Sequence, residues 1–216
     1  MSRGMGIGVG CLAVLVLVVL VLAVGGVGTY NSLVGSSQAV DAQWSQVENV
    51  YQRRADLIPN LVASVKGAAN FEQSTLTQVI EARSRVGQIS GQATQEILND
   101  PQKFQQFQQA QDSLSSALSR LMVVVERYPE LKAVAAFRDL MTQLEGTENR
   151  IAVERRSFNQ VAQEYNTRVR KFPAALFASM FGFKPKPYFQ AQAGAETAPT
   201  VDFGGATPAP APTPGR

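Results

Sequence analysis

Hydrophobic residues are distributed very unevenly along this chain. No charged side chain occurs from Gly4 to Val40, and the core of this stretch, Gly6–Gly28, is almost entirely Val, Leu, Ala and Gly. At about 1.5 Å per residue, that core forms a helix long enough to cross a hydrocarbon layer of about 30 Å. The pattern predicts a transmembrane anchor over residues 1–29, with residues 7–28 in the lipid bilayer, followed by a water-soluble body.

A cleavable secretory signal is the alternative interpretation of the same segment. Arg3 precedes an apolar run at Leu12–Val24, and small residues follow near Gly25. The uncleaved anchor is preferred because the apolar run continues through Val27 without a good cleavage site. Arg3 is also the only basic residue close to either end of the run, so the positive-inside rule places the N-terminus in the cytoplasm and the body outside it.

The clearest periodicity of the body lies near its end. Large apolar residues recur there every seven positions, at Phe137, Leu144, Ile151, Phe158, Tyr165 and Phe172. A sustained heptad repeat predicts a long helix whose apolar stripe is covered by partner helices, as in a coiled coil. Over residues 130–172 this helix would be roughly 64 Å long, so the body is expected to be elongated.

Three further helices are predicted before it, over residues 30–70, 74–92 and 101–128. The last of them has Asp100 as a good N-cap and Pro101 at the position where a helix tolerates proline best. Pro59 lies inside the first, but the apolar phase is the same on both sides of it, which favours a kinked, continuous helix. Residues 91–99 are expected to form a frayed end or a loop.

The predicted fold class is therefore all-α, with no sheet: an N-terminal transmembrane helix and then a domain over residues 30–191. Helices joined by short turns alternate in direction, so this domain is expected to be an elongated antiparallel bundle with heptad packing. Residues 192–216 are rich in Ala, Pro, Gly and Thr and cannot bury enough apolar surface to fold, so a disordered tail is expected. Its residues 201–203, Val-Asp-Phe, form a small apolar hook.

Composition argues against most catalytic and metal-binding chemistry. The chain has no histidine, and its single cysteine, Cys11, lies in the apolar run. Imidazole or thiolate metal sites, disulfides within the body and histidine-based catalysis are therefore excluded, whereas a carboxylate pair or a lysine-based site is not. The net charge of +3 is small, and no G-x-x-x-x-G-K-[ST] loop occurs. We expect no enzyme, no catalytic residue, no metal or cofactor, and no nucleic-acid partner.

Several motifs of the body resemble the signatures of the LemA family. They are RRADLIPNLV at residues 53–62, LEGTENRIA at 144–152, YNTR at 165–168, FP at 172–173, FGFKP at 181–185 and VDF at 201–203. The resemblance covers about residues 30–203. It implies a bacterial, single-pass protein of the cytoplasmic membrane, with an extracytoplasmic bundle of long antiparallel helices. It implies no reaction.

Arg54 stands where the heptad requires an apolar residue, between Tyr51 and Ile58. Its stem could lie along the seam with the charge in water, or it could bind a ligand, but a polar layer that fixes the helix register is the preferred interpretation. If helices 30–70 and 130–172 run antiparallel, residues whose numbers sum to about 202 share one height. The alignment predicts that Arg54, or Arg53, pairs with Glu148 or Glu145, with Asp56 and Arg150 close by.

Two other features carry competing interpretations. Gly146 could be a weak point on an exposed face, but close approach of a neighbouring backbone is preferred. The aromatic ending at residues 172–189, preceded by basic residues, could plug the end of the bundle, lie at the membrane interface, or do both. A short helix or turn is expected there, over residues 173–181.

Two functional classes follow from these features. The preferred one is a membrane-anchored, non-enzymatic helical scaffold or protein-interaction module of the cell envelope, which presents its bundle to other envelope proteins or to further copies of itself. The alternative is a membrane-bound ligand sensor or enzyme that uses the mid-bundle cluster of arginine and glutamate. A deep polar pocket at Arg54 and Glu148 would favour the alternative, and a solid core there would favour the scaffold.

Overall fold

The computed structural model describes residues 2–66, 71–90 and 94–191, without the side chains at 2–11, 13, 18, 19, 21–23, 90 and 94. Within these ranges the chain is helical and contains no strand, which confirms the all-α fold class. The helices are α1 (Ser2–Lys66), α2 (Gln73–Ser90), α3 (Thr94–Asn99), α4 (Pro101–Val125), α5 (Pro129–Ala133), α6 (Ala135–Arg170) and α7 (Ala174–Phe181). The predicted tail and its hook at 201–203 lie outside the described residues.

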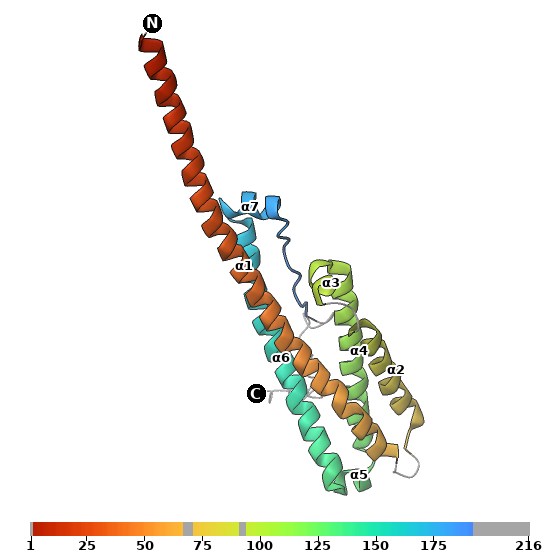
Figure 1. Ribbon diagram of the computed structural model, residues 1–216. Coiled ribbons are helices and arrows are strands. Elements are labelled where there is room, and N and C mark those ends of the chain that lie inside the picture. The colour runs from red at the N-terminus through yellow and green to blue at the C-terminus, as the bar shows by residue number, and fades with distance from the viewer. Residues whose placement is uncertain (1, 67–70, 91–93, 192–216) are drawn as a thin grey trace, which may run out of the picture.

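α1 is the longest element of the fold. Its 65 residues run through Pro59 without a break, so the prediction of a continuous helix is confirmed, and a helix of that length spans roughly 100 Å. Figure 1 shows its N-terminal part projecting well beyond the other helices, while α6 runs alongside its C-terminal part. α1 therefore belongs to the bundle with its C-terminal part and extends beyond it with its N-terminal part.

The membrane anchor stays a prediction. In the part of the chain that the structure describes, no helix meets both the length and the hydropathy that crossing a bilayer requires. Many side chains of the apolar run, including those at 6–11 and 21–23, fall outside the described residues.

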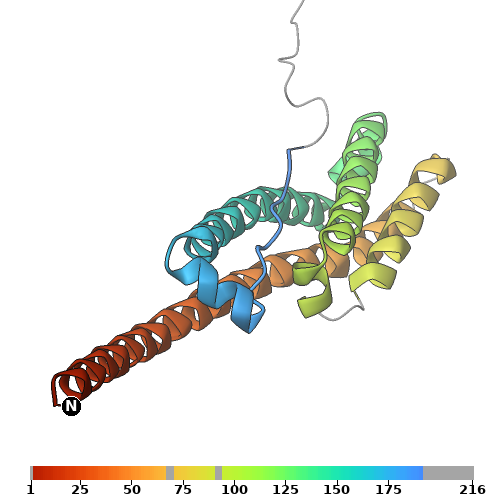
Figure 2. The ribbon, with the colours of Figure 1, turned by 90° about the horizontal axis from the view of Figure 1, so that it is seen from above.

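Four of the helices form two packed pairs. α6 lies along α1, and α2 lies along α4, as Figures 1 and 2 both show. The apolar stripes predicted for α1 and α6 are buried, for example at Trp44, Leu61 and Phe158, each 0% exposed. α4 begins as predicted, because the Asp100 carboxylate accepts hydrogen bonds from the backbone N–H groups of Gln102 and Lys103 at 2.8 and 3.4 Å.

Several predicted boundaries are wrong, among them the end of the helix over 101–128, which stops at Val125. The helix predicted over 130–172 is interrupted at Val134, which has an extended backbone. The heptad stripe begins only at Phe137, so the residues before it have no repeating apolar positions that would hold them in the same helix. α6 ends at Arg170, so Phe172 leaves the stripe and is 78% exposed. The expected loop at 91–99 contains α3, whose Ile97 and Leu98 are buried in the bundle.

The preferred interpretation of Gly146 is also wrong. Gly146 is exposed in the middle of α6, and a Cβ atom placed on it would meet nothing within 4 Å. Its neighbours Glu145 and Arg150 are exposed as well. Within the described residues, no neighbouring backbone approaches α6 at this glycine, so it is a weak point on a solvent-facing surface.

Replacing Gly146 with alanine is expected to raise the free energy of unfolding by about 0.5–1 kcal/mol, because alanine has less backbone entropy to lose in a helix. Urea unfolding of the two proteins under the same conditions measures the change. An unchanged or lower free energy of unfolding would contradict the conclusion that Gly146 faces solvent with room for a Cβ atom.

Candidate functional site

A buried arginine lies at the centre of the bundle. The side chain of Arg54, on α1, is 0% exposed, and its Nη1 contacts Glu148 Oε1 of α6 at 2.8 Å. The same Nη1 donates to Ser115 Oγ of α4 at 2.6 Å, and Nη2 donates to the side-chain and backbone oxygens of Gln111. Ser115 Oγ in turn donates to Glu148 Oε2 at 3.0 Å. Three helices therefore contribute to one hydrogen-bonded group.

A second ion pair adjoins this group. Arg155 of α6 contacts Asp112 Oδ1 of α4 at 2.8 Å, and its Nε donates to the hydroxyl of Tyr51 on α1. The Tyr51 ring centroid is also close to two guanidinium groups, 5.2 Å from that of Arg54 and 5.5 Å from that of Arg155. We call these seven residues the polar layer: Tyr51, Arg54, Gln111, Asp112, Ser115, Glu148 and Arg155.

The polar layer divides the apolar core into two clusters. One cluster contains Ile58, Leu114 and Leu144, and extends toward the α5 end of the bundle. The other contains Trp44, Phe107 and Ile151, and extends toward α7. An arginine can be buried here because its hydrogen-bond donors have partners and its charge has a carboxylate beside it; its Nε alone has none within the described residues.

The predicted register is confirmed by this geometry. Arg54 and Glu148 lie level and form the predicted pair, whereas Arg53 and Glu145 are exposed. Asp56 does not join the layer, since it is exposed and accepts a hydrogen bond from Gln52 one turn away. Sequence reasoning missed Ser115, Asp112 and Arg155. Gln111 was detectable, because it is a polar residue at a stripe position of α4.

Tyr51 makes the stability of the bundle sensitive to alkaline pH. Burial raises the pKa of Tyr51 to about 12, and the nearby charges of Arg155 and Arg54 reduce the rise without cancelling it. An unfolded tyrosine loses its proton near pH 10, so between about pH 10 and 12 the unfolded state binds fewer protons than the folded state and stability falls.

Across that range we expect the free energy of unfolding of the wild type to fall by on the order of 2–3 kcal/mol, a loss that the Tyr51→Phe variant does not show. Unfolding by urea at a series of pH values measures it, with the difference between the two proteins at pH 8 as the baseline. Parallel pH profiles for the two proteins would contradict the prediction.

An extended segment at residues 183–191, the C-terminal strap, crosses from α7 toward α3 and α4 (Figure 1). Side-chain amides of α6 and α4 hold its backbone, each donating to a carbonyl oxygen and accepting from the N–H of the same strap residue at 2.7–3.1 Å. The three pairs are Asn166 with Lys186, Asn159 with Phe189, and Gln108 with Gln190. These paired bonds resemble the pairing of an added β-strand and fix the strap in register.

Two strap side chains are buried. Lys186 is 6% exposed and donates to Asn99 Oδ1 of α3 at 2.7 Å, and burial lowers its pKa while the charge of Asp41 acts in the opposite direction. Phe189 completes an aromatic cluster around Trp44, with ring centroids 6.0 Å apart, and the Arg155 guanidinium lies 5.0 Å from the Phe189 ring. The strap therefore joins α6 to α3 and α4 and closes the core beside the polar layer.

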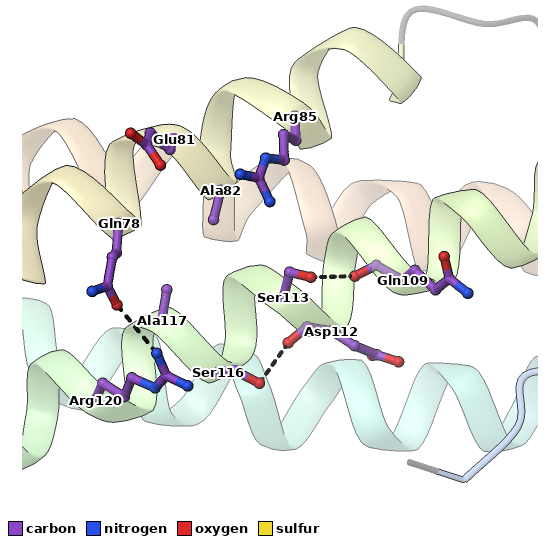
Figure 3. A pocket seen from close by; sticks show the side chains of 10 residues that line it. All are labelled: Gln78, Glu81, Ala82, Arg85, Gln109, Asp112, Ser113, Ser116, Ala117 and Arg120. Carbon is purple, nitrogen blue, oxygen red and sulfur yellow. Dashed lines mark hydrogen bonds between the residues drawn. The ribbon is translucent and has the colours of Figure 1, made fainter. Parts of the chain in front are cut away.

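A groove lies between α2 and α4. It has a volume of about 720 Å³ and opens to solvent. Figure 3 shows Arg120 of α4 directed at Gln78 of α2 across it, where Nη1 donates to Oε1 at 3.3 Å. Asp112 lines this groove, but neither Arg54 nor Glu148 does. Among the described residues, no group of His, Cys, Asp or Glu side chains could hold a metal ion.

These features define a class of protein: an elongated all-helical bundle with a charged layer across its core and a long N-terminal helix. The LemA family pattern matches residues 43–203, and this chain belongs to the LemA family. The match includes both segments that form the Arg54–Glu148 pair.

Individual relatives agree with that assignment. Two proteins named magnetosome protein MamQ, MamQ 2 of Paramagnetospirillum magneticum and MamQ of Magnetospirillum gryphiswaldense, are 31% and 30% identical to this chain over 182 residues. Each alignment covers 78% of this chain and 67% of the relative. The protein LemA of Metamycoplasma hominis is 24% identical over 165 residues, which cover 76% of this chain and 70% of that protein.

Proposed function

We propose that this protein is a membrane-anchored, non-enzymatic helical scaffold of the bacterial cell envelope, which presents its bundle to other envelope proteins or to a second copy of itself. One observation carries the proposal: the charged groups of the polar layer bind one another across three helices, and the central pair, Arg54 and Glu148, does not line the groove between α2 and α4. Such a layer specifies the alignment of helices, which is what a rigid scaffold needs.

The anchor is supported by the apolar run and by the shape of α1. Described side chains along its projecting part are apolar and face outward, for example Leu17, Leu20 and Val24, which are 59–72% exposed. Exposed apolar side chains in such number along one rod are unfavourable in water and suit hydrocarbon. Arg3 supports a cytoplasmic N-terminus and an extracytoplasmic bundle. By analogy with the magnetosome proteins, organisation of membranes is the process we propose it serves.

A ligand sensor or enzyme that uses Arg54 and Glu148 is the alternative. It would require a ligand to reach Arg54, whose side chain is 0% exposed. Both Nη atoms of Arg54 already donate hydrogen bonds, one to Ser115 and one to Gln111. The scaffold needs no such opening and is therefore preferred.

Two measurements test the proposal. Fractionation of cells that express the full chain should place it in the carbonate-resistant membrane pellet with its N-terminus intact. A mature chain that begins near Gly26 or Thr29 would instead show a cleaved signal. The native complex is then compared between the wild type and the double variant Arg54→Met/Glu148→Leu. A scaffold should retain a complex of the same size, whereas loss of the complex from a stable, membrane-bound variant would favour the alternative.

A further inference from the structure

α7 presents an apolar face that no other described element covers. Phe172, just before the helix, is 78% exposed, and Leu176 and Met180 are 63% and 69% exposed. Leu176 and Met180 are spaced by four, so they lie along one side of this short helix, and Phe172 lies just before its first turn. These three large, exposed apolar side chains form a patch of the kind that marks a contact surface.

The opposite side of α7 is fixed against α1. The ring of Phe177 lies directly over Gly26, so closely that a Cβ atom on Gly26 would be 2.9 Å from it. Tyr30 of α1 contacts the rings of Phe181 and Phe183, with centroids 4.9 and 5.9 Å away. Ala178 is 1% exposed. α7 is therefore held in one orientation against α1, beside the start of the projecting part of α1 (Figures 1 and 2).

Basic residues flank α7 in the sequence on both sides, and acidic residues do not. Arg168, Arg170, Lys171 and Lys184 flank α7, and no Asp or Glu occurs between Glu164 and Glu196. Arg168 and Lys171 also line a groove of about 370 Å³ together with Phe172 and small residues of α1, including Gly28 and Thr29. The corner where α1, α6 and α7 meet thus combines cations, a recess and exposed apolar side chains.

We propose that α7 lies in the surface of a lipid bilayer that contains anionic phospholipid. The exposed side chains of Phe172, Leu176 and Met180 enter the boundary between headgroups and acyl chains, and Arg168 and Lys171 contact the lipid phosphates. An apolar face of a short helix beside basic residues is suited to that boundary. The exposed Val24 and Val27 of α1 continue the apolar surface next to α7. This proposal rests on the membrane anchor of the proposed function.

The physical consequence is a second attachment point. A single helix that leaves a bilayer leaves the body free to tilt, whereas α7 in the interface, packed on α1 at Gly26, would fix the bundle's orientation relative to the membrane surface. A scaffold with a fixed orientation presents the same face to every partner.

Nitroxide labels on single cysteines test the proposal with the full chain. Cys11→Ala removes the native thiol, and separate variants Leu17→Cys, Leu176→Cys and Ser119→Cys carry the label in proteoliposomes of phosphatidylcholine and phosphatidylglycerol. Leu176 and Ser119 are both exposed, so the label should leave the fold intact. Relative accessibility to oxygen and to a water-soluble nickel chelate gives the depth of each label. The Leu176 label is expected about 5–10 Å below the headgroup surface, and the Ser119 label in water.

The Leu17 label separates the two proposals. A Leu17 label in hydrocarbon with the Leu176 label in water overturns the α7 proposal and leaves the anchor standing. A Leu176 label in lipid with the Leu17 label in water supports α7 and overturns the anchor. Spin–spin broadening at Leu176, without lipid contact, would assign the apolar patch to a second copy of the chain and overturn the proposal.

Charge is tested with the double variant Arg168→Gln/Lys171→Gln and with vesicles of phosphatidylcholine alone. Each basic residue near an anionic surface contributes about a factor of five, so the ratio of immersed to aqueous Leu176 label should fall roughly 30-fold in the double variant. Vesicles without phosphatidylglycerol should remove that difference between wild type and variant. Equal ratios in both lipids and both proteins would overturn the assignment of Arg168 and Lys171 to the phosphates.

Discussion

Replacing Glu148 with leucine is expected to lower the free energy of unfolding by about 3–5 kcal/mol, because it leaves the buried charge of Arg54 without its counterion. Arg54→Met should cost less, since Glu148 is 28% exposed and keeps a hydrogen bond from Ser115. The double variant should be little worse than Arg54→Met alone, because two apolar side chains can pack where the ion pair was. The double-mutant cycle should therefore give a coupling energy of at least about 2 kcal/mol.

The pair of Arg127 and Glu72 is a matched control. Its N–O distance is 2.9 Å, close to that of the buried pair, but its side chains are 66% and 45% exposed. The same cycle, Arg127→Met with Glu72→Leu, should give at most about 1 kcal/mol. Urea unfolding in mild detergent, followed by tryptophan fluorescence, measures both cycles. A coupling for the buried pair no larger than that of the surface pair would show that the polar layer does not hold the helices in register.

Phe189→Ala is expected to release the C-terminal strap and to cost about 3–5 kcal/mol, as for other buried phenylalanines. Phe189 is 7% exposed and packs on Trp44, Phe104 and Phe158. Trp44 is the only tryptophan of the chain, so its fluorescence reports strap docking directly. Its emission should shift to longer wavelength and become more accessible to acrylamide, and amides of residues 183–191 should exchange faster.

Tyr188→Ala tests whether those changes come from burial or from any alteration of the strap. Tyr188 is adjacent in sequence but 40% exposed. Its replacement should change stability by no more than about 0.5 kcal/mol and leave the Trp44 emission where it is. Equal effects of the two variants would mean that the aromatic cluster is not what holds the strap.

The sequence by itself determined which faces of the long helices are buried. Heptad spacing identified Trp44 and Ile58 on α1 and Leu144 and Phe158 on α6, and all of them are in the core. It also determined the register, because antiparallel helices of known extent leave one alignment in which Arg54 meets Glu148. The family resemblance, carried by linear motifs, needed no coordinates either.

Tertiary structure alone decided what covers each buried face. The spacing of apolar residues along a helix shows that another element covers them, but not which residues that element contributes. The roles of Ser115 and of Phe189 in the strap could therefore be identified only in the folded chain. Local propensity could not predict α3, because burial of Ile97 and Leu98 stabilises a helix too short to form alone. The open surroundings of Gly146 likewise depend on the path of distant helices, since the space beside a residue is a property of the fold and not of its neighbours in sequence.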